Sequence, residues 1–466
     1  MQFFEAQKKI YARRVWGTYR KIKWAAMIAL LGIYYLTPWI RWDRGEHVPD
    51  QAVLIDMAGR RGYFFFIEIW PDEVYYLTGI LILSAIALFF VTSLFGRVWC
   101  GYACPQTVWV DLFMWVERIV QGDRNARMKL DASKLSFDKI YKKSLTHLIW
   151  LFIGLMTGGA WVFYFNDAPT LLEHLLHFDV PWSVLSWIIA LTLSTYLMAG
   201  YAREQVCIYM CPYARFQSAM FDKDTMIIGY DEMRGEKRGK HKQGDSWDNR
   251  GHCIDCTACV QVCPMGIDIR DGLQMECIAC GLCIDACDNI MDKLNLPRGL
   301  VRYDTIHAQQ KKKVQNNIWK KMRLIRPRTI YYSLILITIS GILLFNLLNR
   351  TVVDLTVIHD RNPLFVTLSD GTIRNGYDIK ILNKSHEDKS YKLHVEGVEG
   401  ANIRVQAIDN LDANHLTAYA DSIGHFRVFV TAKKQRESRS NIIFAITDNI
   451  SQNTIHHESI FISDKR

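Results

Sequence analysis

Five stretches of the chain are apolar and contain no Asp, Glu, Lys or Arg over nearly the length that a membrane-spanning helix needs. A helix crosses the hydrocarbon core of a bilayer with about 20 such residues. A buried core helix is the alternative, and it is strongest for the first and shortest stretch, which Trp39 and Trp42 flank as interface anchors. We therefore predict an integral membrane protein with a five-helix transmembrane part, formed by Trp24–Ile40, Val74–Leu94, His147–Phe165, Val184–Tyr201 and Ile330–Leu348.

Lysine and arginine residues near the ends of these stretches predict which connections face the cytoplasm. Seven of them lie in the first 23 residues and nine lie in residues 95–146, whereas residues 166–183 contain none. The N-terminus and the connections after the second and fourth stretches should therefore be cytoplasmic, and the segment from Asn349 onward should lie outside. No small-residue cleavage site follows the first stretch, so we expect no cleaved signal peptide. The net charge of +9 is then a topology signal, and we expect no nucleic-acid binding.

The twelve cysteines test this orientation independently, because all of them fall on the side predicted to be cytoplasmic. A reducing compartment keeps thiols free for metal, and an outer segment without cysteine has no disulfide to form. The cysteines form two short pairs and two runs of four, namely Cys100 and Cys104, Cys207 and Cys211, then Cys253, Cys256, Cys259 and Cys263, then Cys277, Cys280, Cys283 and Cys287.

The two runs share the spacing Cys-x2-Cys-x2-Cys-x3-Cys, which is typical of ferredoxins with two [4Fe–4S] clusters. The first three thiolates of a run hold three corners of one cubane, and the fourth serves the other cluster. Structural zinc is an alternative to the two clusters. The second run departs from the usual motif at one position, because Asp288 stands where a proline usually follows the last cysteine. A purely structural cluster is a further alternative to the electron transfer that we predict. The expected ligand sets are Cys253, Cys256, Cys259 and Cys287 for cluster 1, and Cys277, Cys280, Cys283 and Cys263 for cluster 2.

The two short pairs have the form Cys-x3-Cys-Pro, and each follows a predicted crossing, which indicates an internal repeat with two equivalent sites at one membrane surface. Proline favours the first helical position, so Cys104 and Cys211 should be N-caps, where the helix dipole should lower the thiol pKa. Each pair could bind a soft ion, or the two pairs could form one four-thiolate site for Cu(I), zinc or iron. Helix-break residues without a ligand and a thiol–disulfide relay are alternatives.

Beyond the fifth stretch the hydrophobic pattern changes to the alternation that is typical of strands, with turns such as Asp370-Gly371 and Asn375-Gly376. Short strands at this spacing predict an antiparallel sandwich, a structural or docking module whose partner is unknown. The predicted organisation is 1–23 as a basic N-terminus, 24–230 as a four-crossing membrane domain, 231–250 as a linker, 251–296 as the ferredoxin-type domain, 297–329 as a basic helical connector, 330–348 as the fifth crossing and 349–466 as the outer domain.

These features together resemble the FixG/RdxA/CcoG family, the accessory proteins for assembly of cbb-type cytochrome c oxidase. The resemblance spans nearly the whole chain, since it includes both Cys-x3-Cys-Pro motifs, the tandem runs, the fifth crossing and the β-rich tail. It implies an immunoglobulin-like tail in the periplasm, clusters on the cytoplasmic side of a bacterial inner membrane, and reduction of Cu(II) to Cu(I) for the oxidase. The partners that it implies are an oxidase assembly factor or copper chaperone and an unidentified electron donor. The catalytic copper-binding residues would be Cys100, Cys104, Cys207 and Cys211.

Two other functions are consistent with the same motifs. The chain is also similar to NapH-type membrane ferredoxins, which have four crossings and the same Cys-x3-Cys-Pro pairs, and this similarity implies a quinol dehydrogenase. The fifth crossing and the outer sandwich argue against that function. The second alternative is an assembly scaffold without enzymatic activity, in which the outer domain docks an oxidase subunit and the clusters sense redox state.

Overall fold

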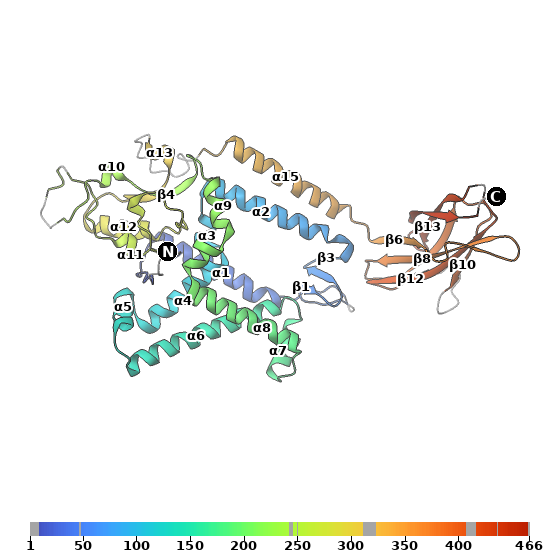
Figure 1. Cartoon of the computed structure of the whole chain (residues 1–466), viewed down its shortest axis with the longest axis horizontal. Helices are drawn as coiled ribbons and strands as arrows, with labels where there is room; N and C mark the ends of the chain where they lie inside the picture. Colours follow the sequence, from blue (N-terminus) through green and yellow to red (C-terminus); the bar gives the residue numbers. More distant parts are fainter. Residues whose placement is uncertain are drawn as a thin grey trace, which may run out of the picture. The chain divides into compact units, whose positions relative to one another are not determined.

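The computed structural model describes residues 9–45, 48–241, 246–248, 250–310, 323–406, 416–435 and 437–464. The chain divides into two compact units, one formed by Met1–Arg44 with Pro49–Leu343 and the other by Gly45–Val48 with Leu344–Arg466 (Figure 1). Residues 1–8 of the predicted N-terminus, parts of the predicted linker and residues 311–322 of the predicted basic connector lie outside the described ranges. Each unit has its own hydrophobic core.

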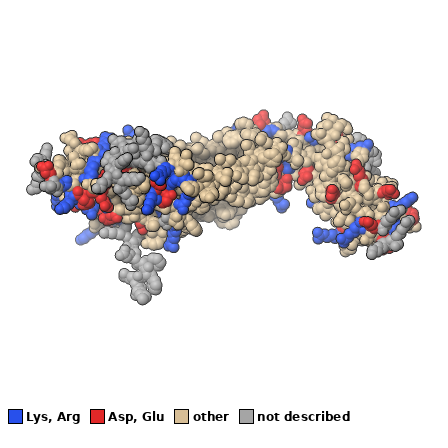
Figure 2. Space-filling view, turned by 90° about the horizontal axis from the view of Figure 1, so that it is seen from above, with Lys and Arg blue, Asp and Glu red and all other residues tan. Residues whose placement is uncertain are grey.

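Four helical stretches in the described part of the chain are long and apolar enough to cross a membrane. They match the second to fifth predicted crossings, which are therefore confirmed as long apolar helices and indicate a multi-pass membrane protein. Figure 2 shows few charged side chains over the long helices, whereas charged residues gather over the cysteine-rich domain. The stretches are Pro71–Phe95, which contains α2 (Tyr75–Phe95); α6 (Phe137–Val162); Trp182–Ala202, which joins α8 (Trp182–Thr195) to the π-helix η3 (Tyr196–Ala202); and α15 (Pro327–Leu348).

The first predicted crossing forms a helix that differs from the other four. Helix α1 (Thr18–Leu36) has three basic residues in its first two turns, and the 3₁₀ turn η1 (Thr37–Trp39) follows it. Its uncharged part, Trp24–Leu36, rises only about 20 Å as an α-helix, whereas the hydrocarbon core is about 30 Å thick. The structure thus supports four of the five predicted transmembrane helices.

Shorter elements connect the long helices and contain the Cys-x3-Cys-Pro motifs. The two crossings before the motifs end at Phe95 and Ala202, because Gly96 and Arg203 adopt positive φ angles of 60° and 40°. Both crossings therefore end within one residue of the predicted ends, Leu94 and Tyr201, and a separate short segment contains each motif. The connecting elements are the antiparallel sheet β1 (Val53–Asp56), β2 (Arg61–Phe64) and β3 (Ile67–Ile69), then η2 (Pro71–Glu73), α3 (Val98–Tyr102), α4 (Pro105–Gln121), α5 (Arg124–Ala132), α7 (Ala168–Leu176), the π-helix η4 (Val206–Met210) and α9 (Pro212–Met220).

A two-stranded antiparallel sheet joins the two ends of the cysteine-rich domain. Strand β4 (Met226–Tyr230) pairs with β5 (Val301–Thr305), with Met226 opposite Thr305. The two strands come from outside residues 251–296, and their apolar residues join Met291 and Leu300 in the core around the cysteines. The remaining elements are α10 (Glu232–Gly235), α11 (Ala258–Gln261), η5 (Ile269–Asp271), α12 (Leu282–Lys293) and α13 (Ile306–Gln310).

The C-terminal unit is a sandwich of two antiparallel sheets, as predicted. One sheet has the order β10-β12-β8-β6 with β7 paired to β8, and the other has the order β11-β9-β13-β14. Alternate residues of the central strands, such as Tyr377, Ile379 and Ile381, are fully buried between the sheets. The strands are β6 (Val353–His359), β7 (Val366–Thr367), β8 (Ile373–Asn383), β9 (Lys389–Glu396), β10 (Asn402–Gln406), β11 (Leu416–Ala418), β12 (Ser422–Ala432), β13 (Arg439–Asp448) and β14 (Thr454–Ile462).

Candidate functional site

The eight cysteines of the two runs line two small neighbouring cavities. The thiol-bearing residues of the first cavity are Cys253, Cys256, Cys259 and Cys287. Those of the second are Cys263, Cys277, Cys280 and Cys283, and Cys259 also borders it. The structure therefore groups the fourth cysteine of each run with the first three of the other run, which is the grouping that the spacing suggested.

Left-handed backbone positions turn each run around its cavity. Asp255 and Thr257 in the first run, and Ala279 and Gly281 in the second, have φ angles between 51° and 76°. The short helices α11 and α12 begin directly after Thr257 and Gly281. A Cβ at Gly281 would lie 2.6 Å from the ring of Tyr19, so the second turn needs glycine for space as well as for its φ angle.

The donor set of each cavity fits a [4Fe–4S] cluster. Burial raises the pKa of Cys259, Cys263 and Cys287 to about 12, so these thiols are protonated at neutral pH when no metal replaces the proton. Four sulfur ligands around one cavity are the ligand set of this cluster, and metal binding requires the thiolate form. Eight thiols in two groups of four thus match two clusters.

The unusual residue after the last cysteine has a structural explanation. Asp288 lies inside α12, which continues to Lys293, and a proline there would clash with the preceding turn. Its carboxylate accepts a hydrogen bond of 2.9 Å from the backbone N–H of Gly299. Burial raises the pKa of Asp288, and the Gly299 N–H partly opposes that change. Asp288 therefore ties α12 to the loop that leads into β5.

The thiols of the two Cys-x3-Cys-Pro motifs lie near enough to interact electrostatically and form what is called the four-thiol group below, although no three of the described cysteine sulfurs lie within 4.8 Å of one another. Cys207 interacts electrostatically with Cys104, Cys100 and Cys211, and burial raises its pKa to about 12. Cys104 and Cys211 are the N-cap residues of α4 and α9, as predicted. The predicted low pKa is wrong for Cys104, because burial raises its pKa more than the backbone N–H groups of the helix lower it.

Cys100 is held in place by two residues, Gln217 and Thr107, that the sequence motifs do not mark. The amide group of Gln217, which is fully buried, lies 3.5 Å from the Cys100 Sγ. Thr107 Oγ1 donates to the carbonyl oxygens of Cys100 and Cys104 at 2.6 and 3.0 Å. The spacing of Thr107 three residues after Cys104 could have suggested its role, but nothing in the sequence places Gln217 beside Cys100.

The first Cys-x3-Cys-Pro motif lies directly against the second run. A Cβ at Gly101 would lie 2.6 Å from the carbonyl oxygen of Ile278, and the Tyr102 hydroxyl donates to the Cys280 carbonyl at 2.9 Å. The buried Arg97 donates to the carbonyl oxygens of Met275 and Ala214, and so links the second run to α9. The four-thiol group and the second cavity are therefore neighbours.

Helix α1 fixes the cysteine-rich domain to the membrane helices. The backbone N–H groups of Tyr19 and Arg20 donate to the carboxylate of Asp285, which lies between Cys283 and Cys287 on α12. The Arg20 guanidinium also forms a buried ion pair of 2.8 Å with Asp111 of α4. These contacts hold α1, α4 and α12 together.

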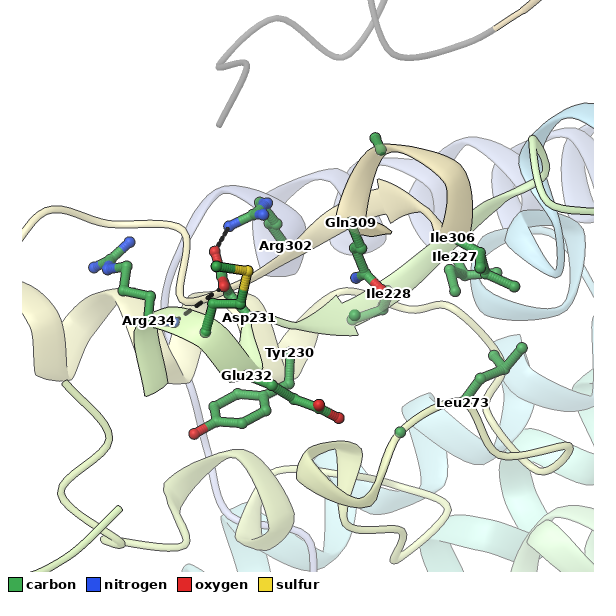
Figure 3. A pocket seen from close by; sticks show the side chains of 14 residues that line it. Ile227, Ile228, Tyr230, Asp231, Glu232, Arg234, Leu273, Arg302, Ile306 and Gln309 are labelled. Atoms are coloured by element: carbon green, nitrogen blue, oxygen red, sulfur yellow. Dashed lines mark hydrogen bonds and ion pairs between the residues drawn. The ribbon is translucent and has the colours of Figure 1, made fainter. Parts of the chain in front are cut away.

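A larger cavity of about 640 Å³ lies beside β4, between α10 and α13 (Figure 3). Two of its charged groups are paired with each other, because Asp231 accepts from Arg302 at 2.7 Å, and Asp231 also accepts from the backbone N–H of Arg234 at 3.2 Å. All twelve cysteines are described, and none of them lines this cavity. Its residues support the β4–β5 pair and are not part of the predicted site.

Family models match three parts of the chain. A model described as a 4Fe-4S dicluster domain matches residues 202–306, which contain Cys207, Cys211 and both runs. A model described as a 4Fe-4S binding domain matches residues 77–122, which contain Cys100 and Cys104. A third model matches residues 343–464. It is described as the IG-like fold at the C-terminal of FixG, and the description classes FixG as an oxidoreductase. The chain thus contains iron–sulfur binding domains and an immunoglobulin-like sandwich.

Curated relatives match nearly the full length. The nitrogen fixation protein FixG of Rhizobium meliloti is 47% identical over 98% of this chain and 92% of FixG. Protein RdxA of Cereibacter sphaeroides is 47% identical over 94% of this chain and 92% of RdxA, and RdxB of the same organism is 45% identical over 98% of this chain and 97% of RdxB. Together with the two cysteine-lined cavities and the sandwich, these matches show that the chain belongs to the FixG/RdxA family of iron–sulfur proteins.

Proposed function

We propose that the chain is a membrane-bound cupric reductase that reduces Cu(II) to Cu(I) for the copper centre of a cbb-type cytochrome c oxidase. The observation that supports this function is the contact between the four-thiol group and the second cysteine-lined cavity, through Gly101, Tyr102 and Arg97. Thiolate ligands favour Cu(I) over harder cations. A thiolate site beside one-electron carriers is therefore suited to bind Cu(II), reduce it, and retain the product.

Each group of cysteines has a distinct role in this proposal. The eight residues of the two runs would hold two [4Fe–4S] clusters in the sets described above, and these clusters supply single-electron transfer when bound. Copper is the substrate, held by Cys100, Cys104, Cys207 and Cys211, and each thiol that binds it releases one proton. Cu(II) gains one electron to become Cu(I), and no bond of the protein backbone or side chains is broken. Gln217 and Thr107 keep Cys100 in place.

We further propose that the cysteine-rich domain lies on the cytoplasmic side of a bacterial inner membrane and the sandwich in the periplasm. The basic residues of 95–146 and the absence of such residues from 166–183 support that orientation. The acceptor of Cu(I) would be an oxidase assembly factor or a copper chaperone, and the sandwich offers a docking module for such a partner.

The experiment is a single-turnover reduction of Cu(II). Protein purified without oxygen is reduced with dithionite, freed of excess reductant, and mixed with Cu(II) and a chromogenic chelator that is specific for Cu(I). The test variant has serine at all four Cys-x3-Cys-Pro positions. The control is Met156→Leu, because Met156 is an exposed sulfur-containing residue of α6 outside the four-thiol group.

We expect the four-serine variant to keep its iron and sulfide content but to lose Cu(I) formation, and the control to keep both. Equal Cu(I) formation by the four-serine variant would overturn the copper assignment. Zinc in place of iron and sulfide in the wild-type protein would overturn the electron-transfer role of the two runs as well.

Removal of the outer domain distinguishes a reductase from a scaffold. The sandwich has a core of its own, formed entirely by residues 353–461. A variant that ends before Thr351 should therefore reduce Cu(II) in vitro at the wild-type rate if the chain is a reductase. A scaffold without enzymatic activity predicts no Cu(I) formation by either form.

A further inference from the structure

A second pocket, which the proposed function does not use, lies where α6, α4 and η3 meet at the polar end of two apolar helices. Its volume is about 280 Å³, close to the lower end of the range of about 300–1,000 Å³ that is usual for ligand pockets. It therefore has room for one substituted aromatic ring but not for a nucleotide cofactor. The lining residues are Lys9, Ile10, Glu117, Gln121, Lys143, Thr146, His147, Trp150, Gly200, Tyr201, Arg203 and Glu204.

One wall of this pocket is aromatic and is joined by hydrogen bonds. The rings of His147 and Tyr201 are stacked, with centroids 5.9 Å apart and an angle of 14° between their planes. Trp150 meets His147 edge to face, with the centroids 5.2 Å apart. The hydroxyl of Tyr196 lies 3.0 Å from His147 Nδ1 and 3.2 Å from the Tyr201 hydroxyl. A planar ligand can therefore stack here beside groups that exchange protons.

The three basic side chains that face the pocket each form an ion pair with a carboxylate. Lys9 and Lys143 both pair with Asp131, at 2.7 and 2.6 Å. Arg203 pairs with the buried Glu117 at 2.6 Å, and this ion pair helps to hold the pKa of Glu117 below its ordinary value although burial acts to raise it. Because each basic side chain already contacts a carboxylate, the pocket is better suited to a neutral ligand than to a phosphate or a free carboxylate.

The backbone at this pocket departs from regular helix. The last turns of the apolar stretch Trp182–Ala202 form the π-helix η3, and Arg203 follows with a φ angle of 40°. Short π-helical segments are frequent at functional sites, and a side chain with positive φ needs support from its surroundings. Here the support comes from the Arg203 guanidinium, which donates to Glu117 and, through Nε, to the Gly200 carbonyl at 2.8 Å.

The pocket lies at the end of an apolar stretch and shares lining side chains with cavities beside the sulfur sites. Tyr201 is 55% exposed and ends an apolar stretch, so a molecule dissolved in the bilayer can reach the wall. Arg203 also lines a smaller cavity that Cys207 and Met265 border. Met265 in turn borders the cavity of the second cysteine run. Shared side chains thus connect this pocket to the four-thiol group and to the second run.

We propose that this pocket binds a hydroquinone, a neutral lipid-soluble aromatic carrier of two electrons and two protons, and that this molecule is the electron donor for the copper reduction, so that its oxidation serves the proposed reductase and does not replace it. The inference rests on the proposed reduction of copper, because it names the donor for that reaction. One hydroquinone loses the hydrogens of its two O–H groups and becomes the quinone. Its two electrons reduce two Cu(II) ions to two Cu(I) ions, and two protons are released.

His147 and Tyr201 are the residues that we expect to touch the ligand. In the tautomer in which the Nδ1–H of His147 donates to the Tyr196 hydroxyl, Nε2 is the ring nitrogen that accepts a proton from the hydroquinone. Tyr201 supplies a stacking surface, and Arg203 and Glu117 are positioning residues that hold η3 in place. Trp150, which is almost fully buried, forms the rigid back of the wall.

The test measures ligand binding and electron entry separately, with the full chain in lipid nanodiscs. Binding of ubiquinone-1 is measured by calorimetry, and the bleaching of the visible cluster absorbance by ubiquinol-1 is followed without copper. The variants are Tyr201→Leu and His147→Leu. Tyr141→Leu is the matched control, because Tyr141 is 58% exposed on the same helix α6 and does not line the pocket.

We expect each pocket variant to weaken ubiquinone-1 binding about tenfold, since each removes a stacking ring and a hydrogen-bonding group. Bleaching by ubiquinol-1 should slow in parallel, whereas Tyr141→Leu should behave like the wild type. Copper reduction by dithionite-reduced protein should be unchanged in all three variants.

Two results separate this inference from the proposed function. If ubiquinone-1 binds the wild type and the pocket variants equally, the hydroquinone site is wrong, even when dithionite-reduced protein forms Cu(I). If the pocket variants lose binding and bleaching but no form of the protein reduces Cu(II), the hydroquinone site stands and the copper function is wrong.

Discussion

Gly101 is the residue on which the contact between the first Cys-x3-Cys-Pro motif and the second run depends. A Cβ added there would lie 2.6 Å from the Ile278 carbonyl oxygen and 3.1 Å from that of Ala279. Both neighbours are backbone atoms, so the chain must shift by about 0.4 Å before the shorter contact reaches even 3.0 Å. Overpacking of this kind destabilises a fold by about 1–3 kcal/mol. Gly101→Ala should therefore destabilise the contact by that amount.

Gly159→Ala isolates this effect, because a Cβ at Gly159 meets nothing within 4 Å. Both glycines lie in helices, α3 and α6, so the gain of up to about 1 kcal/mol in helix propensity is common to the two variants. The difference between them is then the clash alone, again about 1–3 kcal/mol.

The assay is the temperature at which protein in detergent loses its visible cluster absorbance. With a shift of about 2–4 °C per kcal/mol for a domain of 150–250 residues, Gly101→Ala should lose its absorbance several degrees below Gly159→Ala. The Gly101 variant should also form Cu(I) more slowly at equal iron content. The same midpoint for both variants would refute the close approach of the two sulfur sites.

Three further predictions follow from single contacts. Glu117→Gln leaves the buried Arg203 without its carboxylate partner and should destabilise the protein by about 3–5 kcal/mol, seen as a lower midpoint of thermal unfolding. Asp288→Pro introduces the residue usual in ferredoxins but interrupts α12, which should destabilise the domain by about 3 kcal/mol. The variant should therefore retain less iron after purification. Burial acts to raise the pKa of Asp131, but hydrogen bonds from Lys143 and other partners outweigh burial and hold this pKa below its ordinary value of 3.8. The resulting stability is present at neutral pH and lost as the pH falls below 3.8, so unfolding followed by tryptophan fluorescence should depend less on acid in Asp131→Asn than in the wild type.

The features that the sequence predicts well are those set by local spacing. The three cysteines of each run that are separated by two residues line one cavity, and the fourth, which follows after three residues, lines the other cavity. The sandwich is equally local, because alternation along strands such as β8 fixes which side chains are buried. Proline after Cys104 and Cys211 correctly predicts where α4 and α9 begin.

The features that the sequence does not predict depend on contacts between distant segments. The meeting of Cys100 with Gln217 joins residues separated by 117 positions, and β4 (Met226–Tyr230) pairs with the distant strand β5 (Val301–Thr305). The low pKa expected for Cys104 was wrong because burial depends on the whole fold, whereas the helix N-terminus is a local feature. The pocket at His147 likewise needs three helices, and no motif marks it.

The basic residues that predicted the orientation also have a structural role, which changes how that orientation should be tested. Arg20 forms a buried ion pair with Asp111, Lys23 is buried near the same carboxylate, and Arg97 holds the second run. Substitution of these residues would detach the cysteine-rich domain whatever the topology. Charge reversal at the exposed Lys129 and Lys134, which leaves those buried contacts intact, therefore tests the orientation without disturbing the sulfur sites.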